Sequence, residues 1–204
     1  MSSPIAVCID FKSAASYLAL EPTRALEARL GIAFDWRPLI VAPLPRPAPV
    51  QPGDDRGTRH RRARAEYLAR DLARYAAARG LELGDVHRAP DTTLAAQGLL
   101  FLRRFAPERS SDYCARVFAL IWKEGGDVAD AAAIEAALGS AQRGFRDYLA
   151  LDAARELAES QRELAASGVF AVPAYLATGE VFIGRQHLPM IEWLATGQTG
   201  EPPI

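Results

Sequence analysis

A serine follows the first apolar segment of the chain, at the point where a helix is expected to begin. Pro4–Ile9 is an apolar, β-branched run that predicts a strand, and Ala14–Leu30 has the apolar periodicity of a helix that ends at Gly31. Ser13 therefore stands at the start of this helix, where free backbone N–H groups and the helix dipole favour negative charge. A serine hydroxyl does not ionise there at neutral pH, and no Ser-His-Asp arrangement is legible, so Ser13 is a poor nucleophile. Its chemical use would be to donate a hydrogen bond to a thiolate supplied by another molecule.

The alternative for Ser13 is a structural one, because serine is a common helix N-cap. The segment from Ser13 to Ser16 has the spacing of a dithiol motif but holds no thiol, and thiol–disulfide exchange needs an attacking and a resolving thiol. Cys8 and Cys114 lie far apart and form no Cys-x-x-Cys pair. Both cysteines are expected to be inert packing residues. The sequence therefore predicts that the chain is not a dithiol–disulfide oxidoreductase.

Composition excludes several classes of protein. The 204 residues are 50% hydrophobic and 24% charged, which suits one globular unit or one domain with a large insertion. A net charge of −1 argues against a nucleic-acid partner bound through bulk charge. His60, His87 and His187 lack metal-ligand spacing, so no metal site is expected. Neither a membrane span nor a secretory signal is recognisable, and a soluble cytoplasmic protein without a membrane partner is expected.

The predicted elements begin as strand, helix, strand, with Ile32–Trp36 as the second strand, and a proline-rich loop follows from Pro38 to Pro52. Five helical patterns come next: Arg59–Arg79, Thr92–Phe105, Glu108–Glu124, Ala129–Leu138 and Phe145–Ala166. The end returns to β-structure, with a hairpin formed by Ala174–Ala177 and Val181–Ile183, and a last helix over His187–Ala195. A crossover needs far fewer residues than these helices contain, so the pattern predicts an inserted helical subdomain. The expected division is an α/β domain over 1–55 and 166–204, with a helical insertion over 56–165.

This order of elements, with a proline just before the hairpin, resembles the DsbA-like branch of the thioredoxin superfamily. Local motifs are similar to those of the 2-hydroxychromene-2-carboxylate isomerases and the kappa-class glutathione transferases. The matching segments are Asp10-Phe11-Lys12-Ser13-Ala14-Ala15-Ser16-Tyr17-Leu18-Ala19, Arg64-x-x-Tyr67 with Asp71, Pro90-Asp91-Thr92, Gly168-Val169-Phe170-Ala171-Val172-Pro173, and Phe182-Ile183-Gly184. The chain departs from the family at Ala14 and Ala15, where the family has proline and an aromatic residue. It departs again at Arg185-Gln186-His187, where the family has Ser-Asp-Arg.

The resemblance implies a thioredoxin-like fold, βαβ and then ββα around the helical insertion, and glutathione as cofactor. Ser13 would stabilise the glutathione thiolate, and a cis peptide between Val172 and Pro173 would dock the tripeptide. Arg64 matches the family lysine near the glycyl carboxylate. Arg185 and Gln186 occupy the position of the family residues that hold the γ-glutamyl end, where a guanidinium can bind a carboxylate.

The implied function is a glutathione-dependent cis–trans isomerase of the 2-hydroxychromene-2-carboxylate isomerase type, acting on a small aromatic compound in aromatic catabolism. The thiolate would add to a conjugated double bond, allow rotation about the resulting single bond, and leave again. The alternatives are a kappa-like glutathione transferase, which keeps the adduct, and a non-catalytic DsbA-like binding protein. A homodimer is expected from the resemblance alone.

The other polar and aromatic residues have simpler interpretations. The basic run from Arg56 to Arg64 is expected to be a solvated helix face, with Arg64 as its one ligand-binding member. Three tryptophans, Trp36, Trp122 and Trp193, fall in apolar-periodic stretches and predict core positions. Asp10 ends the first strand, where a turn-forming role is favoured over a role as an acid or base.

Overall fold

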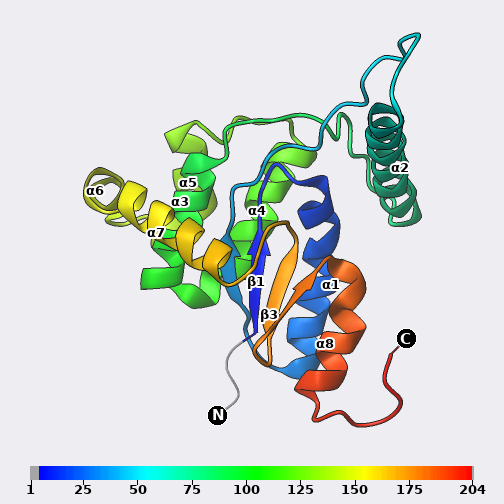
Figure 1. Ribbon diagram of the computed structural model, residues 1–204. Helices are drawn as coiled ribbons and strands as arrows, with labels where there is room; N and C mark the ends of the chain where they lie inside the picture. The colour runs from blue at the N-terminus through cyan, green and yellow to red at the C-terminus, as the bar shows by residue number, and fades with distance from the viewer. Residues whose placement is uncertain (1–4, 204) are drawn as a thin grey trace.

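The computed structural model describes residues 5–203, and at its centre lies a four-stranded sheet (Figure 1). The strands are β1 (Ala6–Ile9), β2 (Asp35–Pro38), β3 (Ala174–Ala177) and β4 (Glu180–Ile183), arranged in the order β2-β1-β3-β4. β1 pairs in parallel with β2 and antiparallel with β3, and β3 pairs antiparallel with β4. The predicted hairpin and the predicted parallel unit are therefore both present, and the fold is α/β.

Two helices cover one face of the sheet. These are α1 (Ala14–Leu30) and α8 (Leu188–Ala195), which lie side by side in Figure 1. The central strands place Tyr175 on this face, where its hydroxyl and that of Thr23 share a hydrogen bond of 2.8 Å, both groups being fully buried. This bond ties α1 to the middle of the sheet and so fixes the direction in which α1 leaves β1.

The opposite face is covered by α7 (Ala153–Ala166). Leu164 of this helix packs in one buried cluster with Cys8 of β1 and Ala174 of β3. All four residues of β1 are buried, since the strand is covered on both faces. An uninterrupted apolar strand is thus the sequence signal of a central position in the sheet.

The second strand lies two to three residues further along than Ile32–Trp36, the segment expected from the sequence. Ile32 is 44% exposed, and pairing with β1 runs from Asp35 to Pro38. Pro38 is accepted because β2 is an edge strand, where a missing N–H does not break a ladder on both sides. Because proline is disfavoured in strands, the sequence does not predict that Arg37 and Pro38 belong to β2.

The helical insertion contains every helix that the periodicity predicts. Its members are α2 (Arg56–Ala78), α3 (Thr93–Phe105), a short 3-10 turn at Pro107–Arg109, α4 (Ser110–Trp122), α5 (Ala131–Leu138), a 3-10 turn at Gly139–Ala141, α6 (Phe145–Leu151) and α7. The single helix expected over 145–166 is divided at Asp152, which ends α6 and begins α7. Its carboxylate binds the guanidinium groups of Arg104 and Arg155, at 3.2 and 2.8 Å. Asp152 makes no side-chain capping hydrogen bond to α7, so the break coincides with a residue of low helix propensity whose carboxylate is held by two arginines.

An aromatic cluster joins the β1–α1 turn to the insertion. The indole N–H of Trp122, at the end of α4, donates to the backbone oxygen of Phe11 at 3.0 Å. Tyr17 of α1 stacks on the same indole, with ring centroids 5.8 Å apart and planes 5° from parallel. Phe11 itself packs against Phe118 at 5.1 Å. The turn that carries Ser13 is therefore packed against side chains of both α1 and α4.

The tryptophans behave largely as the periodicity predicts. Trp36 and Trp122 are buried, with 2% and 7% of their surface exposed. Trp193 is half-buried, and its indole N–H donates to the backbone oxygen of Gly200 at 3.2 Å. Within residues 5–203 no helix is both long enough and apolar enough to span a bilayer.

Candidate functional site

Ser13 is the N-cap of α1. Its hydroxyl oxygen accepts a hydrogen bond from the backbone N–H of Ser16 at 3.2 Å, and its carbonyl accepts one from the N–H of Tyr17 at 3.0 Å. The cap uses only a lone pair of the hydroxyl oxygen, so the hydroxyl proton remains available to a ligand. The structural and chemical roles considered for Ser13 are therefore compatible.

A cavity of about 480 Å³ opens beside Ser13. Its apolar wall comes from the loop after β2, from α2 and from the segment before β3: Val41, Pro43, Leu68, Leu72, Phe170 and Val172. Among the described residues that line it, Lys12 and Ser13 alone have polar side chains. The volume falls in the ordinary range of small-molecule sites, and the few polar groups converge on the start of α1.

The peptide between Val172 and Pro173 is cis and lies at this cavity. Pro173 is buried, and its carbonyl accepts a hydrogen bond from the N–H of Gly184 at 2.8 Å. Within residues 5–203, neither the N–H nor the carbonyl of Val172 makes a hydrogen bond to the protein. Val172 consequently presents a free donor and a free acceptor of the backbone, which is what an extended peptide ligand pairs with.

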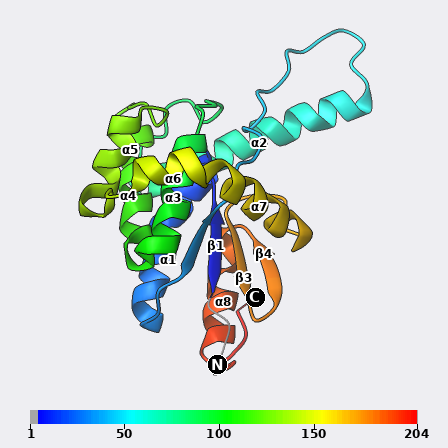
Figure 2. The same ribbon diagram turned by 90° about the vertical axis from the view of Figure 1, so that its left-hand side faces the viewer.

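Arg64 lies outside the Ser13 cavity, in a neighbouring one of about 510 Å³. The two cavities share Pro45 and Leu68 in their walls. The neighbouring cavity lies between the proline-rich loop and the first half of α2, the part of the molecule that projects from the body in Figure 2. Arg64 thus stands along a continuation of the site and not at its centre.

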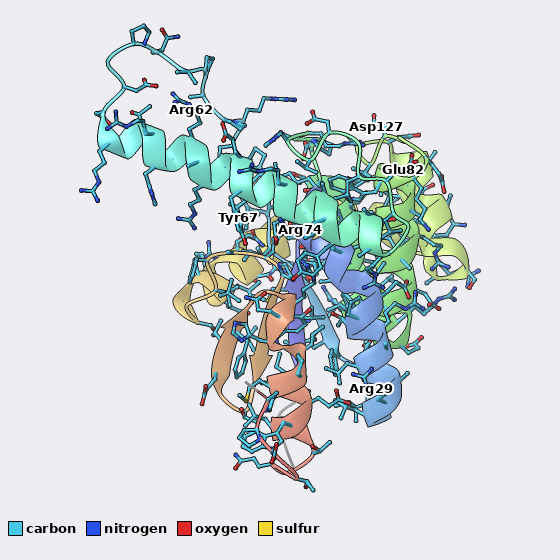
Figure 3. All side chains as sticks on the ribbon, turned by 90° about the vertical axis from the view of Figure 1, so that its right-hand side faces the viewer. Arg29, Arg62, Tyr67, Arg74, Glu82 and Asp127 are labelled. Atoms are coloured by element: carbon cyan, nitrogen blue, oxygen red, sulfur yellow. The ribbon has the colours of Figure 1, made fainter. Side chains whose placement is uncertain are left out.

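Another arginine of the basic run has a structural role. Arg62 faces the preceding loop (Figure 3) and donates to the carbonyls of Ala48 and Pro49, at 2.7 and 2.9 Å. It also forms an ion pair with Asp54. Arg62 therefore holds the proline-rich loop against α2, a role that its position in a run of arginines does not reveal.

Arg185 and Gln186 do not join the cavity in the described part of the chain. Arg185 extends toward α2, where its guanidinium lies 4.0 Å from the ring centre of Tyr75 in a cation–π contact. The amide of Gln186 turns back and donates to the backbone oxygen of Ile183 at 2.9 Å. Of the residues that the sequence selects, the structure brings Ser13 and Val172 to one cavity, with Pro173 buried behind Val172. Arg64 lies in the neighbouring cavity, and Arg185 and Gln186 lie in neither.

Asp10 and Lys12 form a buried ion pair beside Ser13. The two side chains approach to 2.6 Å and have exposed fractions of 1% and 8%. The carboxylate of Asp10 also accepts hydrogen bonds from the Thr92 hydroxyl at 2.9 Å and from the N–H of Val41 at 2.9 Å. Asp10 thus ties the β1–α1 turn to the loop after β2 and to the start of α3, beyond the turn-forming role expected for it.

The cysteines are buried away from the site. Burial raises the pKa of the Cys8 thiol to about 12, and burial likewise holds the pKa of Cys114 well above its usual range. Neither residue lines the cavity at Ser13. Both thiols are therefore protonated at neutral pH, as expected of packing residues.

Known proteins share the sequence profile and the fold of this chain. The profile of the DSBA-like thioredoxin domain matches residues 5–194. The structure of a 2-hydroxychromene-2-carboxylate isomerase is similar at 23% identity, with a TM-score of 0.70 over 96% of this chain and 95% of that one. A putative protein disulfide isomerase from Nitrosomonas europaea is similar at 13% identity, with a TM-score of 0.68 over 98% and 100% of the two chains.

A third similar structure is the cytosolic disulfide reductase DsbM from Pseudomonas aeruginosa, at 15% identity and a TM-score of 0.63 over 96% and 97% of the two chains. No curated protein sequence matches the chain. At these identities the solved structures establish a shared fold, while the profile covers both halves of the sheet and the helical insertion. The chain therefore belongs to the DsbA-like thioredoxin-domain family.

Proposed function

We propose that the chain is a glutathione-dependent isomerase that acts on a small aromatic compound with a conjugated double bond. The observation that carries this proposal is the Ser13 hydroxyl, free to donate into an apolar cavity whose described lining contains no cysteine. A DsbA-like site with a hydroxyl in place of thiols cannot exchange disulfides, so the site suits a thiol brought by the ligand. The 2-hydroxychromene-2-carboxylate isomerase fold supports the choice of reaction.

Glutathione fits the groups present at this site. Ser13 offers a hydroxyl donor at the start of a helix, where negative charge is favoured. Val172 offers a free N–H and carbonyl for the peptide backbone, and Arg64 stands beyond Pro45 for a terminal carboxylate. The structure of the reductase DsbM with GSH, which is similar at 15% identity and a TM-score of 0.58, supports the choice of this ligand.

When bound, glutathione supplies a thiolate that adds to a conjugated double bond and leaves again after rotation. The Ser13 hydroxyl donates to the sulfur and holds it at the start of α1. Val172 orients the tripeptide, while Leu68, Leu72 and Val41 form apolar walls of the cavity. Phe170 lines the same cavity with 79% of its surface exposed, and it offers a ring face to an aromatic substrate.

The second candidate function is a non-catalytic binding protein, and one specific observation supports it. Arg185 and Gln186, at the position where the isomerases and kappa-class transferases hold the γ-glutamyl end, are engaged with Tyr75 and Ile183. A kappa-like transferase would use the same cavity and keep the adduct. Product analysis separates the three: interconversion of cis and trans substrate, accumulation of a conjugate, or neither.

Glutathione is expected to stabilise the protein against thermal unfolding. A ligand at 100 times its dissociation constant adds about 2.7 kcal/mol to the free energy of unfolding. The measurement is the melting temperature with reduced glutathione, compared with S-methylglutathione, which has no ionisable thiol. Reduced glutathione should give the larger increase, because the Ser13 site favours a thiolate. An unchanged melting temperature at millimolar glutathione would refute the proposed function.

A further inference from the structure

A thiolate held at Ser13 would be stabilised by the start of α1 on one side and would face apolar walls on the others. The described walls of the cavity are apolar apart from Lys12 and Ser13. Placing an anion in apolar surroundings is costly unless a counter-charge or several hydrogen bonds accompany it. The Ser13 hydroxyl and the start of α1 offer partial charges only, so a full positive charge at this cavity would add to the stabilisation of a bound thiolate.

Lys12 is the charged residue among the described residues that line the cavity. Its side chain is 8% exposed, and its ammonium group makes one hydrogen bond within residues 5–203, to the carboxylate of Asp10 at 2.6 Å. An ammonium group has three N–H donors. Two N–H donors of the Lys12 ammonium group thus remain for a ligand in the cavity, although the side chain is more than nine-tenths buried.

The Asp10 carboxylate holds the ammonium group of Lys12 in place. This carboxylate accepts four hydrogen bonds, from the backbone and side chain of Lys12, from the Thr92 hydroxyl and from the N–H of Val41. The pair is neutral as a whole, but its positive partner, Lys12, lines the cavity, and its negative partner, Asp10, does not. The other carboxylate near Lys12 is Asp91, which is exposed and accepts a hydrogen bond from the N–H of Thr93 at 2.9 Å.

We propose that Lys12 is the counter-charge for the thiolate that Ser13 receives, a role that rests on the proposed function. Ser13 supplies the direct hydrogen bond, and the ammonium group of Lys12, anchored by Asp10, supplies the positive potential at the wall of the same cavity. Lys12 is thus an electrostatic partner of the bound thiol and not a nucleophile, because its ammonium group is held by the Asp10 carboxylate at 2.6 Å.

The chain offers a matched control for this proposal. Of its 24 lysine and arginine residues only Lys12 and Lys123 are lysines, and Lys123 is exposed at the end of α4. Lys12→Met therefore removes an ammonium group from the cavity, and Lys123→Met removes the same group from the surface. Lys12→Arg keeps the positive charge. The double variant Asp10→Asn/Lys12→Met removes both charges of the pair, so it leaves no unpaired buried carboxylate. It serves if Lys12→Met alone does not fold.

The experiment is a pH titration of glutathione bound to each variant, followed by the ultraviolet absorbance of its thiolate. The pKa of the bound thiol is expected to rise by about one unit in Lys12→Met, and so the thiolate fraction at neutral pH falls up to about tenfold. A rise is expected in the double variant too, while Lys12→Arg and Lys123→Met should titrate like the wild type.

Two results overturn the inference, and they are distinguishable. Glutathione that binds to Lys12→Met, or to the double variant, with an unchanged titration shows that Lys12 has a structural role only. Failure of the wild-type chain to bind glutathione overturns the proposed function, and the inference with it. A purely structural lysine would alter the stability of the protein without moving the titration of a bound thiol.

Discussion

Replacement of Asp10 by alanine is expected to lower the free energy of unfolding by about 3–5 kcal/mol, the range measured when one partner of a buried ion pair is removed. The variant leaves the ammonium group of Lys12 buried without its partner, and it strips the hydrogen-bond acceptor from the Thr92 hydroxyl and the N–H of Val41. These groups connect three segments that surround the cavity. Urea unfolding at 25 °C measures the effect.

Two further variants test the explanation. Asp112→Ala removes a carboxylate that is 66% exposed and paired with Arg24, and its stability should stay close to that of the wild type. The double variant Asp10→Asn/Lys12→Met should lose less stability than Asp10→Ala, since it leaves no unpaired charge. A loss below 1 kcal/mol in Asp10→Ala would contradict the role of the pair as the anchor of the β1–α1 turn.

Removal of the Ser13 hydroxyl is expected to lower kcat/KM for isomerisation by about 10²–10³-fold, the usual effect of losing one preorganised hydrogen-bond donor to a reacting anion. Ser13 is also the N-cap of α1, so a loss of activity could arise from a weakened helix start. Two replacements separate these effects, because alanine at an N-cap costs about 1 kcal/mol and glycine only a few tenths.

Ser13→Gly and Ser13→Ala should therefore lose the same amount of activity and differ in stability. Ser13→Asp retains a good N-cap and places a carboxylate where the thiolate would lie, so it should remain stable and lose glutathione binding. Activity that follows stability across the three variants, with Ser13→Gly nearly fully active, would assign Ser13 to the helix alone.

Much of the fold follows from the sequence because the elements carry strong local signals. The helix at Ala14–Leu30 and the strand at Ala174–Ala177 have the bounds that periodicity and turn residues indicate. Most other bounds shift by one to three residues, and two differences have identifiable local features: Pro38 is tolerated at a sheet edge, and α6 and α7 are divided at Asp152. Apolar periodicity does not predict the order of strands in a sheet, and it does not predict where one residue divides a helical pattern into two helices.

The site was less accessible to sequence reasoning, because its members are selected by contacts between distant segments. Ser13 and Val172 were identified from motifs, and the structure brings them to one cavity. No motif selects Lys12, which lines the same cavity, although it is one of two lysines in a chain that otherwise uses arginine and it precedes Ser13 directly. Its burial depends on Asp10, which in turn depends on Thr92, 82 residues away. Arg185 differs in the opposite way: its place in the sequence predicts a ligand contact, but its guanidinium packs on the ring of Tyr75.

The thiol pKa of glutathione bound to the wild-type protein tests the central claim most directly. A cavity in which the Ser13 hydroxyl and the start of α1 hold a thiolate should lower this pKa clearly below the ordinary value of a thiol, about 8.5. The ultraviolet absorbance of the thiolate, titrated with pH at saturating protein, gives the value, and Ser13→Gly should return it toward that of free glutathione. A bound thiol that titrates like free glutathione in the wild-type protein would contradict the account.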